Sequence, residues 1–294
     1  MPLNSSIVGA AGDWLASEID ARWAMAYAAA LGDTIRCYFD TLDPRGIVAH
    51  PMFPVCFEWP VIVAMRSMFD RTGLSDDEAR RGVHASHDLV IHRHIRPPER
   101  LRSRAFVAAV EQRKPGAFQL TRLETVDERG APVCTTCYGS IYRDVAVEGG
   151  DRIAADPPDA PAPIEGKSVL EIPIPIAAGL AHVYTECARI FNPIHTDAAV
   201  AHRAGLPAII LHGTATLALA VSRIIDTCGG DPSRVRRIAG RFSAMVMMPS
   251  EIVLRILARD PAGDGLRIHF DVLNDGGAAA VRSGMIILDD GDSR

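Results

Sequence analysis

The chain has 294 residues, enough for two average domains or one large one. Hydrophobic residues make up 48% of it and charged residues 23%, which is typical of a globular protein with a substantial core. The net charge of −5 argues against a nucleic-acid-binding surface and against a polybasic membrane-binding patch, and no apolar run is long enough to span a bilayer.

The N-terminal sequence and the cysteine content predict the compartment. Residues 1–13 contain no basic segment followed by a long apolar one, so we expect no export signal. Six cysteines without such a signal are typical of reduced thiols, and the sequence therefore predicts a cytoplasmic protein.

The first half of the chain opens with a helix and continues into strands. Trp23, Tyr27 and Leu31 recur at helical spacing. Four later stretches are suited to strands, at 87–95, 101–112, 118–125 and 133–142. Four histidines in and just before the first stretch, His84, His87, His92 and His94, have a spacing that resembles a metal site. No Cys, Asp or Glu completes a site, so we expect them on the sheet surface and predict no metal.

A segment rich in Pro and Asp separates two halves. Residues 147–168 contain four prolines and almost no large apolar residue, which predicts an extended, semi-rigid linker. The expected domains are residues 1–146, this linker, and residues 169–294.

The second half repeats the order of the first. Leu180, Tyr184 and Ala188 predict its helix, and strands are expected at 238–248, 251–258, 267–273 and 280–288. The turns "VDERGAP" and "LNDGGAA" join matching hairpins. One helix beside an antiparallel sheet, repeated, is an α+β plan.

The two halves also align by residue number. Tyr27, Asp33, Tyr38 and Asp40 fall at the same spacing as Tyr184, Ile190, His195 and Asp197, a constant offset of 184 − 27 = 157. Together with the repeated order of elements, this offset supports a duplication. At the same offset, the positions opposite His212 and Gly213 are Val55 and Cys56.

The stretch "FNPIHTDAAVAHRAGLP" places His195 on a loop between two helices. Pro193 restricts Asn192 to extended geometry, so we expect the preceding helix to end there. Thr196 or Asp197 caps the next short helix, which ends at Gly205. A further apolar helix starts at His212–Thr214, and its free N–H groups suit a carbonyl oxygen that gains negative charge.

These motifs carry a resemblance to a known family. "NPIHTD" followed by "AGLP" and "ILHG" resembles the MaoC-like acyl-thioester hydratase/dehydratase family, and the first half resembles the degenerate N-terminal domain of its two-domain members through "YAAALGD" and "YFD". The resemblance implies a double hotdog: two repeats of a long helix wrapped by an antiparallel sheet. It further implies reversible hydration of a 2-enoyl thioester to a 3-hydroxyacyl thioester, without a cofactor.

The chain departs from the family at the residues that activate water. The family pairs its motif histidine with an Asp five residues earlier, and Ile190 stands at that position. In the first half the Asp is present as Asp33, but Tyr38 replaces the histidine. Glu186 lies one helical turn, roughly 5–6 Å, further from the loop, and helical side chains lean away from His195.

The resemblance and the loop geometry together give a set of candidate residues. His195 is the expected proton-transfer group and Asn192 shapes its loop, so both are predicted as catalytic. Gly213, His212, Thr214 and Ile190 are the predicted substrate-binding residues.

Two other functions remain open from the sequence. One is a non-catalytic acyl-thioester-binding pseudoenzyme subunit, which the missing Asp favours. The other is a hotdog thioesterase. The predicted partners are an acyl thioester of CoA or of an acyl carrier protein, no nucleic acid, no membrane, and a second copy of the chain in a homodimer of double hotdogs.

Overall fold

The computed structural model describes residues 2–66, 73–155, 159, 161–162, 164, 166–263 and 265–290. These residues form two compact units, and neither unit is one continuous segment. The first unit comprises Met1–Ser17, Phe57–His92 and Arg100–Ala160. The second comprises Glu18–Cys56, Arg93–Glu99 and Pro161–Arg294. The strand β2 (Leu15–Ile19) leads from the first unit into the second, and α2 (Pro54–Arg66) leads back.

The first unit is an antiparallel sheet with one long helix. Its main strands are β3 (Gly82–Ile91), β4 (Glu99–Arg113), β5 (Gly116–Asp127) and β6 (Pro132–Arg143), in the order β4-β5-β6-β3. The short strands are β1 (Leu3–Asn4), β7 (Val147–Glu148) and β8 (Arg152–Ile153). The helix α2 buries Val61 against Ala105 and Leu123 of the sheet. A short helix, α3 (Asp76–Arg80), starts at a capping box formed by Ser75 and Glu78.

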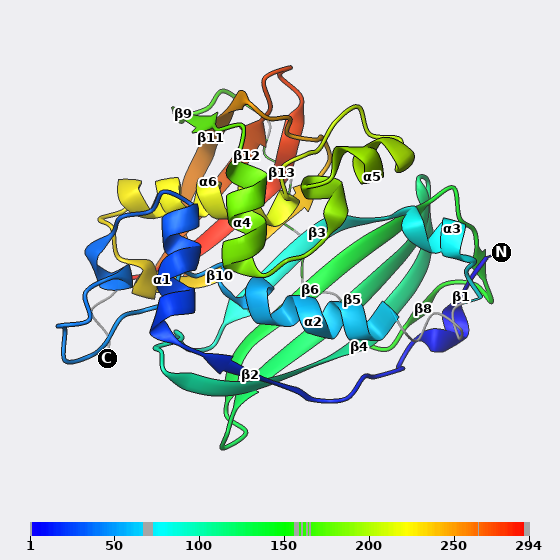
Figure 1. Cartoon of the computed structure of the whole chain (residues 1–294), viewed down its shortest axis with the longest axis horizontal. Coiled ribbons are helices and arrows are strands. Elements are labelled where there is room, and N and C mark those ends of the chain that lie inside the picture. The colour runs from blue at the N-terminus through cyan, green and yellow to red at the C-terminus, as the bar shows by residue number, and fades with distance from the viewer. Residues whose placement is uncertain are drawn as a thin grey trace. The chain divides into compact units, whose positions relative to one another are not determined.

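The second unit repeats this plan with additional helices (Figure 1). Its antiparallel sheet has the order β10-β13-β12-β11-β9. These strands are β9 (Leu170–Ile176), β10 (Val235–Phe242), β11 (Ser250–Pro261), β12 (Gly265–Leu273) and β13 (Ala279–Asp289). The helices are α1 (Ala21–Ala30), α4 (Leu180–Ala188), α5 (Ala198–Arg203) and α6 (Gly213–Thr227). Figure 1 shows α1 beside α4, and the two helices pack together.

Alternating apolar residues build the core of the second unit. Ile268, Phe270 and Val272 of β12 are fully buried, as period-2 alternation requires for one face of a strand. On β13, Gly284 lies beside Phe270, whose ring atoms come within 2.6 Å of the place where a Cβ would stand. The ring therefore occupies the space of a side chain, and only glycine fits there.

The hairpin turns form for the reason expected from their sequences. Asp127 Oδ1 accepts hydrogen bonds from the N–H groups of Arg129 and Ala131, and Asn274 Oδ1 accepts from Gly276 and Ala278. Gly130 and Gly277 follow at φ +83° and +75°, in the left-handed region that favours glycine.

The expected helices and strands are present, with shifted boundaries. The strand expected at 238–248 ends at Phe242, because the following chain pairs elsewhere: Leu211 N–H donates to the carbonyl of Val246. The strand expected at 87–95 runs from Gly82 to Ile91. His87 on this strand is buried, so the prediction that it lies on the sheet surface was wrong.

The expected linker is partly built into the first unit. β7 pairs with β1, and β8 pairs with β4, so residues 147–153 extend the structure before the proline-rich stretch begins. Part of that stretch (156–158, 160, 163 and 165) lies outside the described residues. No helix in the described part of the chain is long and apolar enough to cross a membrane.

Candidate active site

His195 is held by the loop that follows α4. The helix ends at Ala188. The sequence predicted an end at Asn192, four residues later. It ends at Ala188 because Arg189 adopts a left-handed conformation (φ +57°), with its guanidinium over the Trp23 ring at 3.9 Å. A 3₁₀ turn, Pro193–His195, then carries the histidine, and Asp197 caps α5 by accepting from Val200 N–H.

A backbone hydrogen bond fixes the tautomer of His195. Its Nδ1 lies 2.8 Å from the carbonyl oxygen of Ile210. A carbonyl can only accept, so Nδ1 carries the proton and the neutral ring has its lone pair on Nε2. The ring is 9% exposed, and burial lowers its pKa to about 4, against the smaller opposing effect of the Ile210 carbonyl. His195 is therefore a neutral imidazole with a free acceptor at neutral pH.

The second predicted histidine lies directly against the first. The rings of His195 and His212 stack with centroids 3.7 Å apart. His212 precedes α6, and its Nε2 lies 3.2 Å from the Thr185 hydroxyl on α4. Burial and, to a smaller extent, the neighbouring His195 together lower the pKa of His212 to about 2. The loop histidine thus rests on a second neutral ring, which a hydroxyl holds in place.

The start of α6 presents backbone N–H groups beside these rings. The first N–H donating within the helix is that of Thr216, to the His212 carbonyl, so those of residues 213–215 precede the helical hydrogen bonds. The Phe242 ring lies 3.0 Å from where a Cβ of Gly213 would be, which requires a small residue. The Thr214 hydroxyl accepts from Tyr184 O–H at 3.2 Å. Tyr184 in turn lies 3.3 Å, oxygen to oxygen, from Tyr27 of α1.

The remaining candidates differ in their surroundings. Ile190 is 5% exposed, and Phe191 next to it is 60% exposed. Asn192 contributes its backbone to the loop: its carbonyl accepts from His195 N–H at 3.2 Å. Glu186 is exposed on α4 and does not join the buried histidines.

The equivalent region of the first repeat also forms a buried polar cluster in the second unit. Met52 N–H donates to His50 Nδ1 at 3.0 Å, so the proton of the neutral His50 ring is on Nε2, 3.1 Å from the Ser222 hydroxyl. Burial lowers the pKa of His50 to about 3. Asp33 is buried nearby, and burial raises the pKa of its carboxyl, partly offset by hydrogen bonds from Ile35 and Ser222.

A change of offset explains why the sequence alignment missed His50. Tyr27 O–H donates to the carbonyl of Met52, and the equivalent Tyr184 O–H donates to the hydroxyl of Thr214. A histidine lies two residues before each acceptor: His50 before Met52, and His212 before Thr214. The offset is therefore 212 − 50 = 162 here, rather than 157. The assignment of Val55 and Cys56 as the counterparts of His212 and Gly213 was wrong, because the loop that ends at His50 is five residues shorter.

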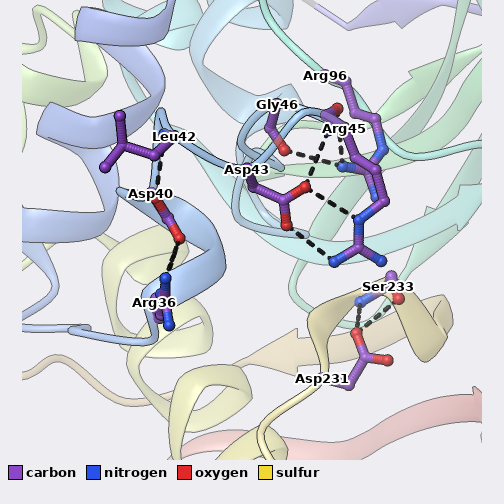
Figure 2. A network of polar contacts seen from close by, with 9 residues as sticks. All are labelled: Arg36, Asp40, Leu42, Asp43, Arg45, Gly46, Arg96, Asp231 and Ser233. Atoms are coloured by element: carbon purple, nitrogen blue, oxygen red, sulfur yellow. Dashed lines mark hydrogen bonds and ion pairs between the residues drawn. The ribbon is translucent and has the colours of Figure 1, made fainter.

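An exposed network of polar contacts shapes that loop (Figure 2). Arg45 forms an ion pair with Asp43 at 2.8 Å, and Arg96 donates to the carbonyl of Gly46 at 3.1 Å. Arg36 and Asp40 make a second pair at the start of the loop. Tyr38 lies against His50 directly, with ring centroids 5.7 Å apart.

The sequence analysis did not single out three polar residues of the site region: Thr185, His50 and Ser222. Thr185 follows Tyr184 on the helix, and its only signal was a hydroxyl on an otherwise apolar face. Among the described residues, no group of three or more His, Cys, Asp or Glu side chains is arranged to hold a metal ion.

Comparison with known proteins places both parts of the chain. Residues 159–270 match the MaoC like domain, and residues 6–136 match the FAS1-like dehydratase domain region. The second half of the chain therefore carries a MaoC-like dehydratase domain. Its MaoC-like domain contains His195, His212 and all the other candidate residues.

Curated relatives match over limited lengths. A peroxisomal enoyl-CoA hydratase 2 of Arabidopsis thaliana is 45% identical over 65 residues, 22% of this chain and 21% of the relative. A fatty acid synthase beta subunit of Emericella nidulans is 33% identical over 141 residues, 47% of this chain and 7% of the relative. The chain thus spans about a fifth or less of the length of these relatives.

Solved structures match over the whole chain. A MaoC-like dehydratase from Phytophthora capsici is 20% identical, with a TM-score of 0.83 and 98% of each chain covered. At this identity the likeness concerns the fold, and it confirms the expected double hotdog.

Proposed function

We propose that this protein reversibly adds water to a 2-enoyl thioester, with His195 as the proton-transfer group. The observation that carries the proposal is the Nδ1 hydrogen bond of His195 to the Ile210 carbonyl, which leaves Nε2 as a free base. The family supports the same reaction, since one relative is a hydratase of enoyl-CoA.

The reaction balances with the groups present. Nε2 of His195 accepts a proton from water while the water oxygen bonds to C3 of the enoyl group. The electron pair of the C2–C3 double bond moves onto the thioester, and the negative oxygen is stabilised by N–H groups at the start of α6. C2 then takes up a proton from the His195 imidazolium, which completes the 3-hydroxyacyl product. The reverse sequence is dehydration.

The candidate residues have different roles in the proposed reaction; they are His195, Asn192, His212, Gly213, Thr214 and Ile190. His212 and Asn192 position His195, one through ring stacking and the other through the loop backbone. Gly213 supplies an N–H for the thioester oxygen. Thr214 holds the helix start against Tyr184, and Ile190 gives the pocket an apolar wall.

The test is the disappearance of the enoyl-thioester absorbance with short and medium trans-2-enoyl-CoA substrates. His195→Ala is expected to lower turnover by about 10²- to 10⁴-fold, the usual contribution of a general acid/base group. His202→Ala is the matched control, because His202 is exposed on α5 and lies within hydrogen-bonding distance of the nearby Pro207 carbonyl.

Three outcomes would contradict the proposal. Turnover that survives in a folded His195→Ala variant places the chemistry elsewhere. Binding of the thioester without turnover identifies a pseudoenzyme subunit, which Ile190 at the family's Asp position favours. Release of free thiol in place of hydration identifies a thioesterase.

We also propose a cytoplasmic protein that forms a homodimer and accepts CoA or acyl-carrier-protein thioesters. We expect the six cysteines to be reduced thiols, as is usual in a reducing compartment. Cell fractionation tests the location, light scattering the homodimer, and a comparison of CoA with carrier-protein substrates the carrier. Detection in a membrane or organelle fraction, a monomeric mass, or turnover with neither carrier would each contradict the corresponding statement.

A further inference from the structure

A cavity lies on the face of the second unit's sheet that points away from α6. It has a volume of about 230 Å³ and is lined by residues of β10, β11, β12 and β13 and by Ala162 and Ile164. Gly240 on β10 faces Leu217 of α6, so its neighbour Arg241 points to the opposite side of the sheet. The cavity is therefore separated from the His195 site by the sheet and the helix.

Two arginines stand side by side in this cavity. Arg241 of β10 and Arg282 of β13 are register partners in the antiparallel pair, which places their Cβ atoms roughly 4.5–5.5 Å apart. Among the residues that the structure describes, neither guanidinium has an ion-pair or hydrogen-bond partner. Both side chains are exposed, and like charges directly opposite one another destabilise a sheet, so an anion bound between these arginines would relieve the repulsion.

The carboxylate of the cavity does not supply that anion. Asp271 forms a two-point ion pair with Arg255, with Nε–Oδ1 and Nη2–Oδ2 distances of 2.8 and 2.5 Å. Its charge is thereby matched by an arginine outside the cavity wall. The two remaining arginines and the hydroxyl-bearing Ser283, on the same stretch of β13, are left to receive a ligand.

We propose that this cavity is a binding site for a phosphate group. Guanidinium groups bind phosphate through paired, charge-assisted hydrogen bonds, and one phosphate can bridge two arginines at this separation. The whole chain carries a net charge of −5, so its overall electrostatic field repels anions. Binding of a phosphate therefore requires the local positive charge of the two arginines.

Inorganic pyrophosphate is the probe, titrated into the full chain by calorimetry and by thermal unfolding at constant ionic strength. We expect saturable binding and a rise in Tm, because a ligand that binds the folded state stabilises it. Arg241→Gln and Arg282→Gln should each weaken binding roughly tenfold, as the loss of charge-assisted hydrogen bonds predicts. Arg259→Gln is the control, since Arg259 is exposed on β11 outside the cavity lining.

The unliganded variants give a second measurement. Removing one of two facing charges relieves their repulsion, so the free Arg241→Gln protein should unfold at the same or a higher temperature than the parent while losing the pyrophosphate-induced shift. Absence of saturable binding, equal binding by malonate, or equal binding in all three variants would overturn the proposal.

Substrate comparison identifies the source of the phosphate. If the arginine variants lower kcat/KM for an enoyl-CoA but leave that for an enoyl-pantetheine unchanged, the phosphate belongs to the CoA carrier of the proposed reaction. If neither changes while pyrophosphate binding is lost, the ligand is a separate phosphorylated molecule. Both results keep the phosphate site, and the calorimetry decides it even if the proposed hydration fails.

Discussion

His195 and His212 stack ring on ring, with centroids 3.7 Å apart and planes inclined by 24°. His195 is therefore supported by a neutral ring, and the residue five positions before it is Ile190, an apolar side chain, in place of the carboxylate that the sequence resemblance implied. Burial of both rings favours their neutral forms, and no carboxylate among the described residues forms an ion pair with either. This contact determines how the site responds to pH and to substitution.

The pH dependence of turnover follows from the lowered pKa of His195. The base must be neutral, and its pKa of about 4 means that activity is lost only as the pH falls through that value. We expect kcat/KM for an enoyl thioester to stay level from pH 8 to about 5.5 and to decline below pH 5. Stopped-flow assays with short exposure to acid separate this decline from unfolding. A decline centred near pH 6.5, the ordinary value, would contradict a desolvated His195.

Thr185 is expected to act as a positioning residue through His212. Thr185→Val keeps the shape of the side chain but removes the hydroxyl that meets His212 Nε2 at 3.2 Å. A net hydrogen-bond contribution of about 0.5–1.5 kcal/mol corresponds to a loss of roughly two- to tenfold in kcat, with KM nearly unchanged. Thr185→Ser, which retains the hydroxyl, should restore kcat. Equal loss in both variants would assign Thr185 a packing role alone.

Ile190→Asp tests what the site has become around its altered position. Ile190 is almost fully buried, so the new carboxylate is expected to lower the free energy of unfolding by about 1–3 kcal/mol and to reduce turnover. Ile190→Asn, similar in size but uncharged, separates the effect of charge from that of shape. Chemical denaturation and the hydration assay give the two measurements. Clearly higher turnover in the Asp variant would reveal a decayed but recoverable Asp–His pair.

The first unit carries a buried carboxyl whose titration affects stability. Glu58 of α2 is 1% exposed, accepts a hydrogen bond from Thr136 at 2.7 Å, and has a pKa raised to about 7, chiefly by burial. Because the folded pKa of Glu58 lies above its unfolded value, the contribution of Glu58 to the free energy of unfolding is present at low pH. This contribution is lost as the pH rises toward 7.

Glu58→Gln removes this titration and keeps an acceptor for Thr136. The stability of the variant relative to the parent should therefore increase by roughly 2 kcal/mol between pH 5 and pH 8, because the parent loses the contribution of protonated Glu58 over this range. Urea unfolding at both pH values measures the change. Glu99→Gln is the comparison, because Glu99 is 16% exposed and paired with Arg93, and a parallel pH response in both variants would refute the assignment to Glu58.

The repeat and its turns were determined by the sequence alone. Tyr27 and Tyr184 lie on equivalent helices because apolar residues recur at helical spacing, and Asp127 and Asn274 form turns through bonds to neighbouring N–H groups. Such features depend on interactions between residues close together in the chain. The loop that carries His195 could be predicted for the same reason.

Only the tertiary structure decided the chemistry of the histidines. The tautomer of His195 depends on the Ile210 carbonyl, and the environment of His50 depends on Ser222, which is 172 positions away. The spacing from Tyr38 to His50 is 50 − 38 = 12 residues, against 212 − 195 = 17 in the second repeat. Packing between helices brings His50 and His212 to equivalent places although their loops differ in length. A constant sequence offset therefore cannot align the two histidines.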